Sequence, residues 1–279
     1  SLAGEETVVA APELNVCFDV GKAPRDIIKI DHVLLSHGHM DHAAGLAYYL
    51  SQRNFVGIAP GTVLTPADLA PAIRALMNAW GELEGHVTPA NIVAMQPNQE
   101  HELRRGLVAR AFAVNHGVPS LGYSVIDVRR KLKPEFDDKT GRELVELKKK
   151  GIEIQYTLEV PLIAYCGDTA EGAFLQLDHV RKARVLIIEC TFYEPEHVSR
   201  ARAGKHFHAR DFARIMPDLD NDYILITHVT RRTGLREAKE LLSRLLPDEQ
   251  MARVRFLMEG KRRRPSPPPA FVQADAGEQ

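Results

Sequence analysis

Short apolar runs that stop at a polar side chain recur along this chain and predict alternating strands and helices. Val33-Leu34-Leu35 has the character of a short buried strand, and similar runs occupy residues 107–114, 161–165, 184–188 and 222–227. Each run is followed closely by a histidine, an aspartate or a glutamate. We therefore expect an α/β fold whose chemistry gathers at the ends of its strands.

Apolar residues recur at helical spacing in two segments after the first of these runs. The apolar positions after Asp41 place Asp41 and His42 in the first turn of a helix. Thr65 and Pro66 predict the cap and first residue of a second helix, whose apolar stripe is Leu69, Ile73, Leu76, Met77 and Trp80. Two further helices are expected over residues 142–150, ending at Gly151, and over residues 235–246.

Composition narrows the class of protein. With 279 residues and 44% hydrophobic content the chain can build a large core, and its net charge of -1 gives no general attraction to polyanions. Cys17, Cys166 and Cys190 form neither a disulfide framework nor a zinc finger, which favours a reducing compartment. No run approaches the roughly 20 apolar residues that a membrane span needs, so we expect a cytoplasmic protein that binds no membrane.

The chain divides into two parts by composition. Residues 1–259 are expected to form one hydrolase domain, whereas residues 260–279 begin with Lys261 to Arg264 and continue rich in Pro, Ser and Ala. Such a basic, proline-rich tail is typical of disorder, and either a solubilising role or RNA binding is open for it. Residues 129–155 form a charged insertion with many Lys and Arg, which either contacts phosphates or is simply a solvated surface.

Ligand-type residues cluster behind the predicted strands. His37, His39, Asp41 and His42 fall within six residues, and His116, Asp168, His206, His208 and His228 follow later strand-like runs. Imidazole and carboxylate groups are ligands for zinc-type ions, and about six or seven of them suit two ions that share one carboxylate. The sequence therefore predicts a dinuclear metal site for hydrolysis.

These motifs resemble the metallo-β-lactamase superfamily, and within it they are most similar to ribonuclease Z. His116 is followed by Gly122-Tyr123, Asp168 lies in Cys-Gly-Asp-Thr, and His228 lies in Ile-Thr-His-Val-Thr-Arg-Arg; these segments are similar to the family's His followed by Gly-Tyr, its Gly-Asp-Thr and its Thr-His-x-Ser-x-Arg. The resemblance implies an αββα sandwich with two divalent metal ions, zinc first and Mn or Fe as alternatives. It also implies the metal ligands: His37, His39 and His116 for one ion, Asp41, His42 and His228 for the other, and Asp168 bridging them.

Two further segments resemble ribonuclease Z in particular. Glu189-Cys190-Thr191-Phe192 is similar to the end of the family's His-Glu-Ala-Thr-Phe, with Ile188 in place of its His. Lys205-His206-Phe207-His208 is similar to the family's Gly-His-Ser-Thr. The resemblance implies Glu189 and His206 as a proton-donating pair, with His208 as the alternative donor. Asp41 is the third catalytic candidate, and the candidates for substrate binding are His208, Arg231 and Arg232.

The resemblance implies an endoribonuclease in which a metal-bridging hydroxide cleaves a phosphodiester, with precursor tRNA 3′ ends as the partner RNA. A hydrolase of a small phosphodiester, a thioester or a lactone is the alternative, and a non-catalytic RNA-binding or partner-binding subunit is a third reading. We expect no protruding arm, because residues 129–155 lack the Gly/Pro-rich composition of the family's arm. A homodimer is implied by resemblance only. Because the first motif begins at residue 37, a missing first strand is one interpretation.

Overall fold

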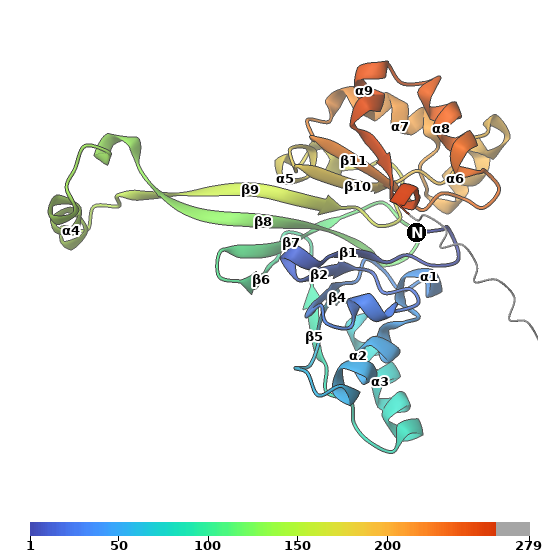
Figure 1. Ribbon diagram of the computed structural model, residues 1–279, viewed down its shortest axis with the longest axis horizontal. Helices are drawn as coiled ribbons and strands as arrows, with labels where there is room; N and C mark the ends of the chain where they lie inside the picture. Colours follow the sequence, from blue (N-terminus) through green and yellow to red (C-terminus); the bar gives the residue numbers. More distant parts are fainter. Residues whose placement is uncertain (261–279) are drawn as a thin grey trace, which may run out of the picture.

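Two β-sheets lie face to face between two layers of helices in the computed structural model, which describes residues 1–260 (Figure 1). The first sheet has the order β1-β2-β3-β4-β5. Its strands are β1 (Val9–Ala11), β2 (Val16–Phe18), β3 (His32–Leu34), β4 (Thr62–Pro66) and β5 (Asn91–Met95). Strands β2 to β5 run parallel, so their carboxyl ends meet at one edge.

The second sheet has seven strands in the order β12-β11-β10-β9-β8-β7-β6. They are β6 (Glu100–Arg104), β7 (Leu107–Ala113), β8 (Leu121–Leu132), β9 (Gln155–Tyr165), β10 (Val185–Glu189), β11 (Tyr223–Thr227) and β12 (Val254–Phe256). Strands β9 to β12 are parallel to one another, whereas β6 to β9 form antiparallel pairs. The four strands expected from apolar runs in this half of the chain are therefore confirmed as β7, β9, β10 and β11.

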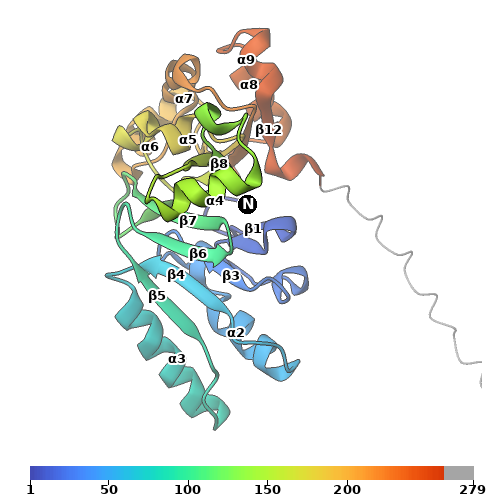
Figure 2. The same cartoon turned by 90° about the vertical axis from the view of Figure 1, so that its left-hand side faces the viewer.

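Helices cover the outer face of each sheet, and Figure 2 shows the layers in succession from α2 and α3 at one side to α7, α8 and α9 at the other. The first layer contains α1 (Met40–Ala43), α2 (Leu46–Phe55) and α3 (Ala70–Glu84). The second contains α5 (Asp178–Arg181), α6 (Val198–Gly204), α7 (Ala209–Ile215), α8 (Leu235–Ser243) and α9 (Asp248–Arg253). None of the helices within residues 1–260 is long and apolar enough to cross a membrane.

Three apolar clusters correspond to the three interfaces between these four layers. Phe18 and Leu34 pack between the sheets, while their strand neighbours Cys17 and Val33 pack under α2 and α3. On the far side, β10 and β11 present Ile188 and other apolar residues to the helices of the second layer. Because successive residues of a strand point to opposite faces, each central strand serves two cores. The expected αββα sandwich is confirmed.

An arm projects from the body of the molecule, contrary to the expectation from composition (Figure 1). The outer halves of β8 and β9 pair as a ribbon from Asp127↔Val160 to Leu132↔Gln155, and α4 (Gly141–Lys149) lies at its tip. The side chain of Thr140 and that of Glu143 cap this helix reciprocally. A paired ribbon satisfies its own backbone hydrogen bonds, so it extends into solvent without glycine or proline.

One predicted helix start is wrong. Thr65 and Pro66 belong to strand β4, and α3 begins later, at Ala70, with Pro71 in its first turn. The apolar stripe is only partly core, since Ile73 and Met77 are buried while Leu76 and Trp80 are 48% and 41% exposed. The predicted tail, residues 260–279, lies outside the described residues except for Gly260, and the domain boundary at 259 stays a prediction.

Candidate functional site

The predicted ligands come from four segments that each follow a strand of one of the two sheets. His37, His39, Asp41 and His42 lie on the loop after β3 and in α1, and His116 follows β7. Asp168 and His228 follow the parallel strands β9 and β11. The structure brings all seven side chains together at one end of the sandwich.

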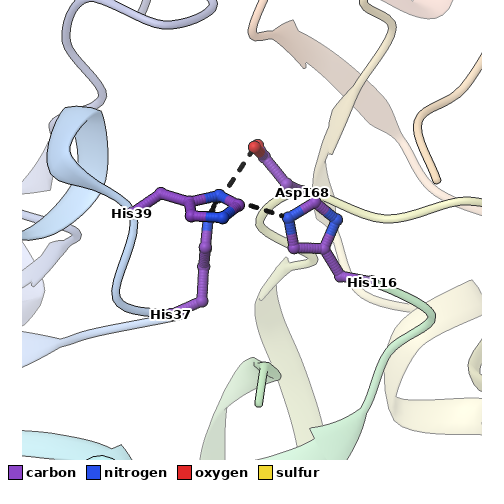
Figure 3. Close-up of side chains that lie close together, drawn as sticks. All are labelled: His37, His39, His116 and Asp168. Carbon is purple, nitrogen blue, oxygen red and sulfur yellow. Dashed lines mark hydrogen bonds and ion pairs between the residues drawn. The ribbon is translucent and has the colours of Figure 1, made fainter. Parts of the chain in front are cut away.

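The first group contains His37, His39, His116 and Asp168, which Figure 3 shows converging from both sheets. One donor atom from each lies within 4.8 Å of the others. His37 Nε2 is 3.0 Å from His39 Nδ1, and His116 Nε2 is 3.4 Å from the same nitrogen. Three imidazole nitrogens at this spacing, beside a carboxylate, are an arrangement that suits a cation.

The second group contains Asp41, His42 and His228, again with donor atoms within 4.8 Å of one another. His228 Nε2 is 3.3 Å from Asp41 Oδ2 and 3.2 Å from Asp168 Oδ2. The other oxygen of Asp168 is 3.3 Å from His42 Nε2. Asp168 therefore touches both groups, as a carboxylate that bridges two ions would.

The chemistry of these two groups of side chains suits bound cations. His42 Nε2 and Asp168 Oδ1 are buried 3.3 Å apart, and neither has a hydrogen-bond partner of good geometry within residues 1–260. Burial opposes charge on His42, but the carboxylates of Asp168 and Asp19 raise the pKa of this imidazole well above its usual value. Without metal, a proton thus takes the positive charge that a divalent ion would bring, and metal binding would release it.

Two other ligands are held in the ionisation state that coordination requires. Burial lowers the pKa of His37 to about 2, so its ring is neutral and has a lone pair to donate. Burial alone would raise the pKa of Asp168, but the imidazoles of His228 and His42 lower it well below its usual range. Asp168 is therefore present as a carboxylate between the two groups.

Asp19 supports the site from behind and was missed by sequence reasoning. It follows β2 in a left-handed conformation with φ of 55°, and it is completely buried. Its carboxylate lies 2.7 Å from His42 Nδ1 and accepts hydrogen bonds from Ser36 N at 2.7 Å, from Ser36 Oγ at 2.8 Å and from the hydroxyl of Tyr165. A carboxylate behind a ligand histidine fixes the orientation of its ring. The signal was present, because Asp19 also ends a buried apolar run.

Glu189 and His206 form the predicted pair beside the two groups of candidate metal ligands. Glu189 Oε1 is 2.7 Å from His206 Nδ1, and the buried Glu189 carboxylate also accepts hydrogen bonds from Thr169 N and Phe207 N. The His206 ring lies 5.3 Å from the ring of His228, centroid to centroid. Burial lowers the pKa of His206, but the Glu189 carboxylate raises it more, to about 9. A protonated imidazole therefore faces the cleft at neutral pH.

His208 has a different environment from the one expected for a substrate contact. It is 1% exposed, and its Nδ1 accepts a hydrogen bond from Arg210 N as the N-cap of α7. Its Nε2 donates to the backbone carbonyl of Glu194 at 3.0 Å. Both ring nitrogens are thus used within the fold, and His208 holds α7 in place instead of facing the cleft.

A pocket of about 420 Å³ opens beside His206 and His228. Two residues expected to bind substrate, Arg231 and Arg232, line it, and Arg231 forms an ion pair with Glu5. Arg200 of α6 also lines the pocket and was not predicted. The N-terminal segment closes one side, where Gly4 N donates to Asp41 Oδ2 at 2.8 Å. The mouth of the site is therefore cationic, which suits a phosphate-containing substrate.

Comparison with known proteins places this geometry in a family. The beta-lactamase superfamily domain matches residues 8–229. tRNase Z TRZ1 of Arabidopsis thaliana is 31% identical over 250 residues, which cover 88% of this chain and 89% of the relative. The chain belongs to the tRNase Z family of this superfamily.

Solved structures share the fold at lower identity. The metallo-beta-lactamase fold protein YhfI from Bacillus subtilis has a TM-score of 0.62 at 16% identity and covers 91% of this chain and 92% of its own. The short form of human tRNase Z has a TM-score of 0.55 at 18% identity and covers 81% of this chain and 85% of its own. At these identities the likeness concerns the fold alone.

Two of the departures from the tRNase Z motifs lie in the apolar core. Ile188 replaces a histidine of the motif, and its side chain is fully buried in the core under the second helical layer. Phe207 replaces a serine and packs in the same core at 1% exposure. These two substitutions therefore change the packing behind the site, while the carboxylate of Glu189 and the ring of His206 remain in contact.

Proposed function

We propose that this chain is a metal-dependent endoribonuclease that cleaves a phosphodiester at the 3′ end of precursor tRNA. One observation carries the proposal: the hydrogen-bonded pair of Glu189 and His206 lies beside a donor set for two cations, at a mouth lined by arginines. The curated relative above is named a tRNase Z, and its likeness extends over most of both chains.

The seven clustered side chains would hold the metal ions. We assign His37, His39 and His116 to one ion, Asp41, His42 and His228 to the other, and Asp168 to both, with zinc as the metal proposed first. Two such ions would lower the pKa of a water molecule and offset negative charge on the phosphate. Asp19, Ser36 and Tyr165 keep the ligand rings and carboxylates in place.

His206 is the proposed proton donor. Its Nδ1 is held by Glu189, so the other ring nitrogen is free to protonate the departing oxygen of the cleaved bond. Its raised pKa keeps the ring protonated before the reaction. Arg200 and Arg232 at the mouth would bind neighbouring phosphates, and Arg231 would join them when it exchanges Glu5 for a phosphate.

The arm is proposed to bind the body of the tRNA. Residues 129–155 contain nine Lys or Arg and six Asp or Glu, a surplus of three positive charges in a chain whose net charge is -1. Some of the basic side chains are occupied, such as Lys149 by Glu146 and Arg129 by Asp127. Others, including Lys148 and Lys150, have no ion-pair partner within residues 1–260 and remain available for phosphates.

A homodimer and a reducing compartment are further proposals. Met40, Leu76, Trp80 and Leu83 are large apolar side chains exposed on α1 and α3, where a second copy would cover them. The three cysteines are free and buried, which suits the cytoplasm. Light scattering of the purified protein, with Trp80→Glu as the disrupting variant, tests the first of these.

The central experiment compares substrates. Purified protein loaded with zinc is incubated with a precursor tRNA carrying a 3′ trailer, with bis(p-nitrophenyl) phosphate and with a thioester. We expect cleavage of the precursor near its 3′ end and slower cleavage of the small phosphodiester. Activity confined to the thioester would refute the proposal, and so would a wild-type protein that cleaves neither phosphodiester at any metal concentration.

A further inference from the structure

Lys205 occupies a position where a glycine would be expected. It follows α6 and directly precedes His206, and its backbone has a left-handed φ of 53°. The turn is needed because α6 must end and reverse: Lys205 N donates to Arg202 O, and His206 N donates to Ala201 O at 2.9 Å. A side chain with a Cβ is strained in this conformation, whereas glycine is not.

The turn around Lys205 is tightly constrained on its other side as well. A Cβ added to Gly204 would come within 2.9 Å of Cδ2 of His206, so the ring of the proposed proton donor packs against this glycine. The position of the His206 ring is therefore coupled to the backbone of residues 204–206. Any motion of the turn would move the ring relative to the metal groups.

The side chain of Lys205 connects this turn to the first group of candidate metal ligands. Its Nζ donates to the backbone carbonyl of His116 at 3.0 Å, across 89 positions of sequence. The rings of His116 and His206 meet edge to face with their centroids 5.3 Å apart. The ammonium thus joins the loop of a proposed metal ligand to the loop of the proposed donor.

We propose that Lys205 is a positioning residue, which holds the His206 loop at a fixed distance from the His116 loop. The inference rests on the proposed function. It adds the contact of Lys205 with His116 to the contact of Glu189 with His206. Glu189 fixes the direction of the His206 ring, while Lys205 fixes the backbone that carries the ring. Small displacements of a reacting group reduce the rate of reaction more than they reduce binding.

The test uses three substitutions and kinetic constants on precursor tRNA. Lys205→Gly removes both the ammonium and the strain, Lys205→Met removes only the ammonium, and Lys205→Arg keeps a charged donor. We expect kcat to fall about tenfold in the Gly and Met variants with KM within about twofold of wild type, and to recover in the Arg variant. Lys22→Met, an exposed lysine elsewhere, is the control and should match wild type.

A second readout does not depend on activity. The amide of Gly117 shares a peptide unit with the carbonyl of His116, so loss of the hydrogen bond from Lys205 should shift its resonance in a ¹H–¹⁵N spectrum of the full chain. We expect this shift in the Gly and Met variants. We also expect Lys205→Gly to melt above Lys205→Met, because only glycine relieves the left-handed conformation.

Each contrary outcome has a distinct meaning. A raised KM with unchanged kcat would overturn the positioning role and make the ammonium a substrate contact. An unshifted Gly117 amide in Lys205→Met would overturn the link itself, whether or not the protein cleaves RNA. A wild-type protein inactive on precursor tRNA would refute the proposed function, but a shifted Gly117 amide in Lys205→Met would still show that Lys205 links the two loops.

Discussion

Strands β8 and β9 contribute to two regions of the molecule, the cleft at one end and the arm at the other. At the cleft end, Tyr123 and Tyr165 are almost fully buried, and the chain continues from β9 to Asp168. At the arm end, Leu132 pairs with Gln155, and α4 buries none of its residues. At about 3.3 Å per residue, the two ends of β9 lie roughly 35 Å apart.

The two ends differ in what fixes their side chains. In the cleft, several donors surround the Asp19 and Glu189 carboxylates, so each side chain has one position. On the arm, side chains such as Lys148 are exposed and are held by little except their own backbone. Chemistry at a phosphate needs fixed atoms, whereas binding a long polyanion needs reach and charge. Substitutions should therefore affect catalytic rate at the cleft end and RNA binding at the arm end.

The largest effect is expected at the carboxylate that touches both ligand groups. Asp168→Asn keeps the shape of the side chain but removes the charge that His42 and His228 contact, so metal content should fall and cleavage should drop by at least about 10³-fold. Bound metal is measured by plasma mass spectrometry alongside the rate. Asp220→Asn, on the surface, is the control. Full metal content in Asp168→Asn would contradict the bridging role.

The next largest effect separates two neighbouring histidines. His206→Asn should lower kcat by about 10²- to 10³-fold, because the proton donor is lost. His208→Asn should stay active, since asparagine can also cap α7. The pH profile adds a check: the Glu189 carboxylate raises the pKa of His206, to about 9 without bound metal, so wild-type kcat should fall as pH rises through the pKa of this imidazole. Loss of activity only in His208→Asn would reverse the assignment.

A smaller effect is expected behind the ligands. Asp19→Asn leaves at least one of its donors, from Ser36, His42 or Tyr165, facing an amide instead of a carboxylate oxygen. We expect zinc affinity or activity to fall about 10- to 100-fold, the usual cost of removing a residue that orients a metal ligand. Titration with a competing chelator measures the affinity. An affinity equal to that of Asp178→Asn, a surface control on α5, would show that Asp19 does not orient His42.

The candidate metal ligands could be found from the sequence, whereas the residues that hold them in place could not. His37 to His42, His116, Asp168 and His228 could be found because ligand-type residues repeatedly end apolar runs. Asp19 ends such a run too, but a lone carboxylate carries no spacing pattern, and its partners Ser36 and Tyr165 are distant in sequence. Thr65 and Pro66 indicate a helix start in the sequence because Thr followed by Pro occurs both at the start of helices and, as here, at the end of a strand.

The arm escaped prediction for a different physical reason. Its composition was compared with a Gly/Pro-rich pattern, whereas protrusion here depends on the pairing of Val128 with Glu159 and of the residues beyond them. Cross-strand pairing is a non-local property that a single strand does not display. The role of His208 was misjudged likewise, because a helix cap and a substrate contact call for the same polar side chain.

The smallest effect on catalysis, and the clearest contrast with the cleft, is expected from the arm. Lys148→Ala combined with Lys150→Ala removes two charges near the end of α4. The KM for precursor tRNA should rise about three- to tenfold. The slope of the logarithm of the binding constant against the logarithm of salt concentration should become shallower by about 0.9 per lost phosphate contact. Hydrolysis of bis(p-nitrophenyl) phosphate should not change, because this substrate is too small to reach the arm.

A matched control decides whether position or net charge matters. Lys22→Ala combined with Lys29→Ala removes the same charge from exposed sites in the N-terminal half, and KM should stay within about twofold of wild type. If both double variants raise KM equally, the RNA responds to the total charge of the protein and the arm has no special role. If the arm variant instead lowers the rate on the small phosphodiester, the arm and the cleft are coupled, and their separation along β8 and β9 does not divide binding from catalysis.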